Sequence, residues 1–167
     1  ETGVRMGALA NKDQVKEVSG KVQELSKTQE IVFGKLDDFD VKGADKNKGA
    51  FISPILFLNS DPFKYTDCHN IEAFGPVSTI IPYHNIDEAI ELARMGKGSL
   101  CCSVVTADDD FAREFVIGAA SMHGRILILN SDCAKESTGH GSPLPMLVHG
   151  GPGRAGGGEE MGGKRGV

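Results

Sequence analysis

The amino-acid sequence predicts an α/β fold with a mostly parallel sheet. Helical and strand-like stretches alternate along residues 11–130, with turn signals between them, and this alternation is typical of strands covered by crossover helices. The order strand, helix, strand, helix, strand between Val77 and Leu129 predicts parallel neighbours joined by right-handed crossovers. The chain has 167 residues, 40% of them hydrophobic, which is enough to bury one core.

One helix and two strands are predicted in the first third of the chain. Asn11, followed three residues later by Gln14, is a capping box. The helix that it starts carries apolar residues at helical spacing, namely Val15, Val18, Val22 and Leu25. Residues 30–33 and 55–58 are short apolar runs and predict strands, whereas the polar, glycine-bearing segment 35–49 between them predicts a surface excursion.

The next elements follow the same alternation. Residues 77–83 predict a strand, and Asn85 with Glu88 forms a second capping box. The helix that follows is predicted to end at Gly96, because glycine favours the end of a helix. Residues 99–106 predict another strand.

A third helix and a last strand complete the predicted alternation. We expect Thr106 to cap this helix and Gly124 to mark its end, with a buried strand over residues 125–130. Three acids stand in its first turn, Asp108, Asp109 and Asp110. Favourable interaction with the positive end of the helix dipole explains them better than a metal ion does, so no metal site is predicted.

Composition and charge exclude several classes of protein. The formal net charge is −5 without a long block of either sign, which argues against nucleic acid as a partner. The longest strongly apolar segment, 51–58, is far too short to span a membrane. No secretion signal is recognisable and a cytoplasmic location is expected. The four cysteines lack zinc or disulfide spacing, so reduced thiols are expected at Cys68, Cys101, Cys102 and Cys133.

The amino-acid composition changes at Lys135, from which point glycine and proline are frequent. We therefore divide the chain into an α/β part, residues 1–134, and a Gly/Pro-rich segment, residues 135–167, of the same domain. Residues 151–156 match G-x-G-x-x-G, but a preceding strand, a following helix and a downstream acid are not predicted there. Residues 158–164 have P-loop spacing, but Arg165 follows where Ser or Thr must reach magnesium. Both matches are interpreted as coincidence.

Several single residues have an ordinary structural interpretation. Cys101 and Cys102, adjacent on a predicted strand, should point to opposite faces and pack in the core. Cys133 is a better candidate nucleophile because Lys135 is close to it, yet a structural role is favoured there too. Three isolated histidines, His69, His84 and His123, are expected to be solvated or bonded to backbone. The chain lacks the G-x-S-x-G elbow of a Ser/His hydrolase.

Glu72 and Phe74 form the pair with the most specific chemistry. A carboxylate can accept hydrogen bonds from both hydroxyls of a ribose, and an aromatic ring two residues away lies on the same face and can pack against the attached base. A surface glutamate at a strand entry beside a core phenylalanine explains the same residues. The residues alone leave both interpretations open.

Two motifs resemble the aldehyde dehydrogenase family. Residues 72–77, Glu-Ala-Phe-Gly-Pro-Val, are similar to its Glu-x-Phe-Gly-Pro signature, and residues 149–160 are similar to the glycine-rich crossing of its catalytic domain. Residues 5–9, Arg-Met-Gly-Ala-Leu, resemble its Gly-Pro-Leu stretch. The resemblance implies a three-layer α/β/α catalytic domain with a mostly parallel sheet, of which this chain is an incomplete piece.

The glycine-rich segment resembles one particular branch of this family. Residues 134–145 and 148–160 look like the aldehyde dehydrogenase part of the phenylacetate-degradation bifunctional proteins. This resemblance implies NADP-dependent oxidation, with NAD as the alternative cofactor, of a CoA-linked semialdehyde of the 3-oxo-5,6-dehydrosuberyl-CoA type in aerobic phenylacetate catabolism. The 3,4-dehydroadipyl-CoA semialdehyde dehydrogenases of benzoate catabolism rank second.

The resemblance also assigns roles to individual residues. It places Glu72 at the nicotinamide ribose, Phe74 near the nicotinamide ring, and Glu160 on a proton path. His149, with His140, would make the mouth of the substrate tunnel polar and suited to a CoA-bearing aldehyde. The family's nucleophilic Cys and base Glu are expected upstream, so the isolated chain is expected to be inactive. The missing upstream half is then its partner, in an enzyme expected to be a homo-oligomer.

A protein of a different class stays open on the sequence alone. A non-catalytic α/β binding module could use its glycine loop to wrap a partner or a phosphate. Cofactor titration would separate the two only with the upstream half present, because Glu72 supplies one side of a shared site.

Overall fold

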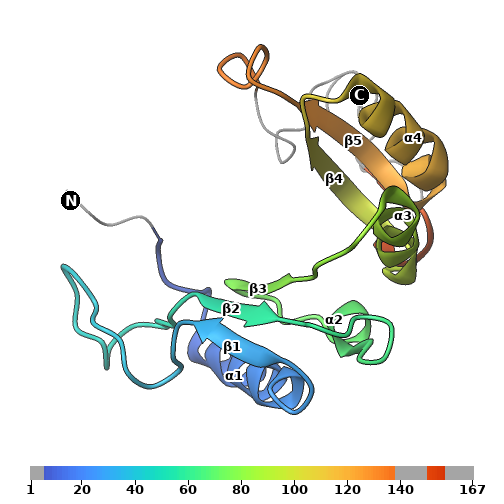
Figure 1. Cartoon of the computed structure of the whole chain (residues 1–167). Coiled ribbons are helices and arrows are strands. Elements are labelled where there is room, and N and C mark those ends of the chain that lie inside the picture. The colour runs from blue at the N-terminus through green and yellow to red at the C-terminus, as the bar shows by residue number, and fades with distance from the viewer. Residues whose placement is uncertain (1–5, 138–149, 157–167) are drawn as a thin grey trace. The chain divides into compact units, whose positions relative to one another are not determined.

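The computed structural model describes residues 6–137 and 150–156, and its elements fall into two compact units, Glu1–Pro82 and Tyr83–Val167 (Figure 1). The first unit contains α1 (Lys12–Leu25), β1 (Glu30–Phe33), β2 (Ile55–Leu58), α2 (Asp67–Asn70) and β3 (Val77–Ile80). The second contains α3 (Ile86–Met95), β4 (Ser99–Val105), α4 (Asp109–Ala119), η1 (Ala120–Met122), β5 (His123–Leu129) and η2 (Gly153–Ala155).

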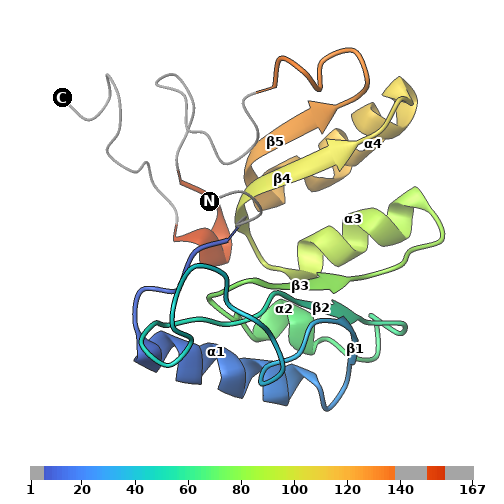
Figure 2. The same cartoon turned by 90° about the vertical axis from the view of Figure 1, so that its left-hand side faces the viewer.

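A three-stranded sheet and one long helix build the first unit (Figure 2). The strand order is β1-β2-β3, with β1 antiparallel and β3 parallel to β2. The apolar stripe of α1, made of Val18, Val22 and Leu25, packs against Ile55 and Phe57 on one face of β2. Val18, Val22 and Phe57 are fully buried, so this contact is the core on which the site described below rests.

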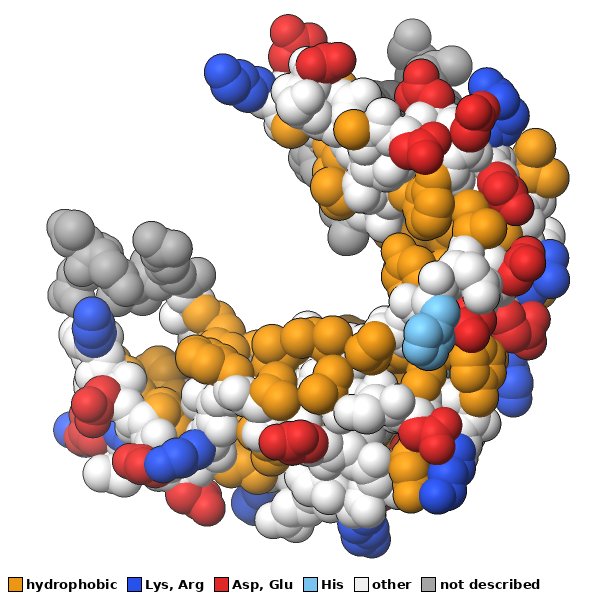
Figure 3. Space-filling model, viewed as in Figure 1, with side chains coloured by type: hydrophobic (Ala, Val, Ile, Leu, Met, Phe, Trp, Pro, Cys, Tyr) orange, Lys and Arg blue, Asp and Glu red, His pale blue; other side chains and the backbone are white. Residues whose placement is uncertain are grey.

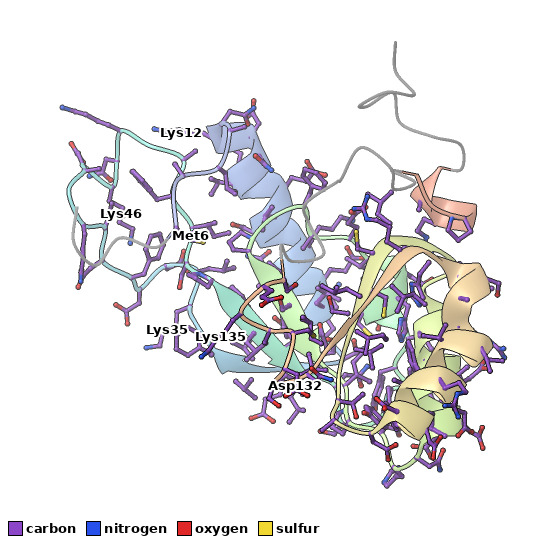
Figure 4. All side chains as sticks on the ribbon, turned by 90° about the horizontal axis from the view of Figure 1, so that it is seen from above. Met6, Lys12, Lys35, Lys46, Asp132 and Lys135 are labelled. Carbon is purple, nitrogen blue, oxygen red and sulfur yellow. The ribbon has the colours of Figure 1, made fainter. Side chains whose placement is uncertain are left out.

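The excursion between β1 and β2 is held in place by lysine side chains (Figure 4). The ammonium group of Lys46 donates to the carbonyls of Asp37 and Phe39, both at 3.0 Å, and lies 3.9 Å from the centroid of the Phe39 ring. Lys12, the first residue of α1, donates to the carbonyl of Asn47 at 2.8 Å. The segment carries no regular element, as predicted.

The second unit pairs two parallel strands and covers one face with two helices. Ser99 lies opposite His123, and Val105 opposite Leu129, in the β4–β5 ladder. The covered face holds the buried residues Ile90 of α3 and Phe115 of α4, with Val104 of β4 beneath them. Cys102 packs against this cluster, whereas Cys101 on the opposite face accepts a hydrogen bond from Arg125 at 2.8 Å. The two thiols thus point to opposite faces, as predicted.

The sequence predicted most element bounds closely and several ends wrongly. The last helix is capped by Asp108 and not by Thr106, because the Asp108 carboxylate accepts from the amides of Asp110 and Phe111. Gly124 lies inside β5 instead of ending that helix, which ends at Ala119. The glycine serves close packing there, because a Cβ would overlap the carbonyl oxygen of Gly150. The strand predicted over 77–83 ends at Ile80.

The expected pairing of successive strands from Val77 onward is half right. β4 and β5 are parallel neighbours, but β3 belongs to the three-stranded sheet and β4 to the two-stranded one. An alternating pattern predicts crossovers but does not fix which strands become neighbours. The fold is α/β, as predicted, with two small sheets.

Part of the predicted site lies outside the described residues. His140, His149 and Glu160 are among these positions, as is Arg5 of the stretch that resembles the family's Gly-Pro-Leu motif. Within residues 6–137 and 150–156, no helix is long and apolar enough to cross a membrane.

Candidate functional site

Glu72 and Phe74 lie side by side on the surface of the first unit, in the segment that leads into β3. Both side chains are exposed, and the ring of Phe74 is 72% accessible. They line one shallow hollow of about 540 Å³ together with the first turns of α1, which contribute Asn11, Asp13, Gln14 and Glu17. The alternative of a core phenylalanine is therefore wrong, and the pair faces a concave surface.

A second hollow adjoins the first and shares Glu72, Phe74 and Gln14 with it. It measures about 590 Å³ and lies between residues 6–9 and residues 72–76, with Gln14 at its edge. Residues 6–9 are tied to the unit by the amide of Leu9, which donates to the carbonyl of Ala50 at 2.9 Å. Hydrophobic side chains gather on the exposed surface of this unit (Figure 3). Glu72 and Phe74 border both hollows, so a ligand in either one can reach them.

Helix α1 fixes the position of the segment that carries this pair. The amide nitrogen Nε2 of Gln14 donates to the carbonyl of Phe74 at 2.8 Å. Gly75 packs so closely on α1 that a Cβ at this position would lie 2.9 Å from Cγ2 of the buried Val18. On the strand side, the amide of Ile55 donates to the carbonyl of Pro76 at 2.9 Å. The glycine of the Glu-x-Phe-Gly-Pro motif thus serves close packing.

The chemistry of the first hollow suits a neutral diol better than a phosphate. Three carboxylates line it, those of Asp13, Glu17 and Glu72, and they oppose an anionic group by like-charge repulsion. An ionised carboxylate only accepts hydrogen bonds and can take two hydroxyl donors at once. The exposed face of Phe74 offers a flat apolar surface to a ring.

The cysteines do not contribute to this site. Neither hollow is lined by a thiol. Burial raises the pKa of Cys102, with a smaller contribution from Cys101, which makes this thiol a poor nucleophile. Cys133 sits in the turn after β5, near Asp132 and Lys135 (Figure 4), where its Sγ lies 3.4 Å from the amide nitrogen of Asn130. That contact gives Cys133 a structural role in the turn.

Two of the described histidines, His84 and His123, are bonded to neighbouring side chains. Nδ1 of His84 lies 2.8 Å from the Glu88 carboxylate, which also accepts from the backbone amide of His84. This backbone hydrogen bond, followed by the one to the ring, lowers the pKa of Glu88. Nδ1 of His123 lies 2.7 Å from Oγ of Ser99, and burial lowers the pKa of the imidazole. Neither histidine borders the two hollows.

The glycine-rich crossing packs on the chain itself, over the first residues of β4 and β5. The amide of Arg154 donates to the carbonyl of Lys97 at 2.9 Å, and Gly151 approaches the carbonyl of Ser99. Residues 150–156 therefore find packing partners within the same unit. The three-residue helix η2 stands where a dinucleotide fingerprint requires an α-helix, in line with the rejected match.

Two contributors to the site went unrecognised in the sequence. The sequence indicates Gln14 only as part of a capping box and Gly75 only as a member of the Glu-x-Phe-Gly-Pro motif. The spacing of Gln14 from Asn11 was a usable signal for the cap, but its bond to a residue 60 positions away has no local signature. Among the described residues, no group of three or more His, Cys, Asp or Glu is arranged to hold a metal ion.

Comparison with known proteins places this arrangement in a family. The profile of the aldehyde dehydrogenase family matches residues 1–164. The chain is 52% identical to the protein MaoC of Klebsiella aerogenes over 97% of its length and 47% of that protein. It is 37% identical to the 3,4-dehydroadipyl-CoA semialdehyde dehydrogenase of Aromatoleum evansii over 90% of its length and 29% of that enzyme.

A solved structure supports the same fold. Lactaldehyde dehydrogenase from Escherichia coli superposes with a TM-score of 0.72 at 22% identity, over 99% of this chain and 31% of that one. The chain therefore spans less than half the length of these relatives and of this structure. The profile match over nearly all of its residues shows that the chain belongs to the aldehyde dehydrogenase family.

Proposed function

We propose that this chain forms part of an NADP-dependent dehydrogenase that oxidises a CoA-linked semialdehyde, and that Glu72 and Phe74 hold the nicotinamide end of the cofactor. One observation carries the proposal: both side chains are exposed and line the same hollow, on a segment fixed by α1. A solvated glutamate beside an exposed phenylalanine has no role in the core of the unit, whereas a ribose with its attached ring uses both groups.

The described residues fit the nicotinamide ribose. The carboxylate of Glu72 would accept hydrogen bonds from the two ribose hydroxyls, and the ring of Phe74 would pack against the attached base. A cofactor held by Glu72 and Phe74 would supply the hydride acceptor for oxidation of the aldehyde. The acidic lining of the hollow would disfavour the phosphates of the cofactor there. NAD is the alternative cofactor, because Glu72 and Phe74 would contact only the end that both dinucleotides share.

The proposed substrate is a semialdehyde attached to CoA, of the 3-oxo-5,6-dehydrosuberyl-CoA type. The resemblance of residues 134–145 and 148–160 to the phenylacetate-degradation bifunctional proteins supports this choice. The name of the Aromatoleum evansii relative supports a CoA-linked semialdehyde in general and makes 3,4-dehydroadipyl-CoA semialdehyde the second candidate. Family membership favours a dehydrogenase over a non-catalytic binding module.

The remaining catalytic groups would come from polypeptide outside this chain. Neither hollow contains a thiol, so we propose that the nucleophilic Cys, the base Glu and the dinucleotide fold lie upstream in the whole enzyme. That enzyme would be a cytoplasmic homo-oligomer, and its complete catalytic domain would have three layers. Residues 1–134 would supply the α/β part and residues 135–167 the segment at the substrate tunnel, with His140 and His149 at its mouth and Glu160 on a proton path.

A chimeric enzyme tests the proposal. In this chimera the present chain replaces the matching segment of the Aromatoleum evansii dehydrogenase. We expect it to reduce NADP with a CoA-linked semialdehyde and to use the same aldehyde without CoA poorly. Glu72→Gln should raise the KM for NADP about 10- to 100-fold, the range expected for lost hydrogen bonds to a charged group.

The control is Glu24→Gln, which changes an exposed carboxylate on α1 that pairs with Lys21. This control should leave the KM for NADP unchanged. Equal KM values in Glu72→Gln and Glu24→Gln would contradict the cofactor role of Glu72. Equal use of free and CoA-linked aldehydes would contradict the substrate class.

A further inference from the structure

We propose that Gln14 is a positioning residue of the cofactor site. Its side-chain amide holds the segment of Glu72 and Phe74 in the position in which both can contact a ribose and its attached base. This inference rests on the proposed function, because it gives Gln14 a task within the site assigned to the nicotinamide ribose. Gln14 is the third residue of α1 and lines both hollows.

The side-chain amide of Gln14 joins three segments of the first unit. Its Oε1 accepts from the amide of Ala10 at 3.0 Å, and its Nε2 donates to the carbonyl of Phe74 at 2.8 Å. The backbone amide of Gln14 donates to the side chain of Asn11 at 2.8 Å. Because an amide has its acceptor and its donors on opposite sides, the bond from Ala10 directs Nε2 towards Phe74.

The segment before β3 is hydrogen-bonded to two other elements, and Gly75 also packs against Val18 of α1. The amide of Ile55 holds the carbonyl of Pro76 from the sheet side at 2.9 Å, and Nε2 of Gln14 holds the carbonyl of Phe74 from the helix side. Between them, the backbone bonds are local turns, such as the amide of Gly75 to the carbonyl of Ala73 at 2.7 Å. Loss of the helix-side hydrogen bond loosens residues 72–74, which lie between Ile71, packed against the core, and Gly75, packed against α1. The strand itself stays in place.

The substitution Gln14→Glu separates positioning from folding. A glutamate has nearly the same shape and still accepts from Ala10, but it cannot donate to the carbonyl of Phe74. An acid at the third position of a helix is favourable for the capping box and for the helix dipole. The thermal midpoint should therefore stay the same or rise, whereas a merely structural role of Gln14 would lower it.

The experiment measures steady-state kinetics of the chimera. Gln14→Glu should raise the KM for NADP about three- to tenfold, the range for one lost neutral hydrogen bond, and leave kcat and the KM for the aldehyde unchanged. Gln23→Glu is the matched control, because it makes the same change at an exposed position of the same helix. In the background of Glu72→Gln, the effect of Gln14→Glu should shrink, since only the part that acts through Phe74 remains.

The outcomes distinguish this inference from the proposed function. Equal KM values in Gln14→Glu and Gln23→Glu, or an undiminished effect of Gln14→Glu in the background of Glu72→Gln, overturn the inference alone. An unchanged KM for NADP in Glu72→Gln overturns the proposed function and this inference with it. The dissociation constant of NADPH, measured by its fluorescence, gives the same comparison where turnover is slow.

Discussion

Replacement of Gly75 by alanine tests the packing that presents Glu72 and Phe74. The new Cβ would lie 2.9 Å from Cγ2 and 3.1 Å from Cγ1 of Val18, whereas carbon atoms in contact are normally about 3.5–4.0 Å apart. Val18 is fully buried and cannot turn away into solvent. We expect Gly75→Ala to lower the free energy of unfolding by about 1–3 kcal/mol, as overpacked cores do.

A second glycine on the same helix supplies the control. Nothing lies within 4 Å of a Cβ at Gly20, in the middle of α1, so Gly20→Ala should stabilise the chain by about 0.5–1 kcal/mol. Urea unfolding followed by far-UV circular dichroism measures both changes. In the background of Val18→Ala, which removes both crowded methyl groups, Gly75→Ala should cost less than about 0.5 kcal/mol. Equal stability of Gly75→Ala and Gly20→Ala would refute the close contact.

Three further predictions follow from the site and from the shifted pKa values. Burial lowers the pKa of His123 below 6.5, so the unfolded chain takes up this proton first as the pH falls. The free energy of unfolding should therefore drop more between pH 7 and pH 5.5 in the wild type than in His123→Gln. Equal drops would contradict this prediction. The pKa of the Glu88 carboxyl should be below 4.5 by NMR titration and should rise only in part in His84→Ala, because the backbone amide that lowers it most remains; a full return to 4.5 would contradict that assignment. In the chimera, His140→Phe and His149→Phe should lower kcat/KM more for CoA-linked semialdehydes than for free aldehydes, whereas equal losses would remove the proposed role of both residues.

Sequence patterns predicted the local elements because their determinants are local. The N-caps at Asn11 and Asn85 form as expected, with each side chain accepting from the amide three residues later. The reciprocal bonds of the capping boxes come instead from the preceding amides, Ala10 to Gln14 and His84 to Glu88. The strands at 30–33 and 55–58 have the predicted bounds. The N-cap of the last helix was harder to predict, because Thr106 and Asp108 both precede it and both can cap a helix. Only the carboxylate of Asp108 accepts from two amides of the first turn.

The parts that sequence reasoning missed depend on contacts between distant segments. Gly124 was interpreted as a helix end because its neighbour at Gly150 is invisible in the sequence. The bond from Gln14 to Phe74 and the fit of Gly75 on Val18 are likewise non-local. The pair Glu72 and Phe74 was identified by its motif, but its exposure over a shared hollow needed the structure.

The central claim is that the carboxylate of Glu72 binds the ribose diol. A double-mutant cycle, with one change in the enzyme and one in the cofactor, tests it most directly. The chimera and its Glu72→Gln variant are compared on NADP and on an analogue that lacks both hydroxyls of the nicotinamide ribose. If Glu72 binds this diol, each single change weakens cofactor binding and the two together cost little more than one. Fully additive losses would show that the carboxylate of Glu72 and the ribose hydroxyls do not interact.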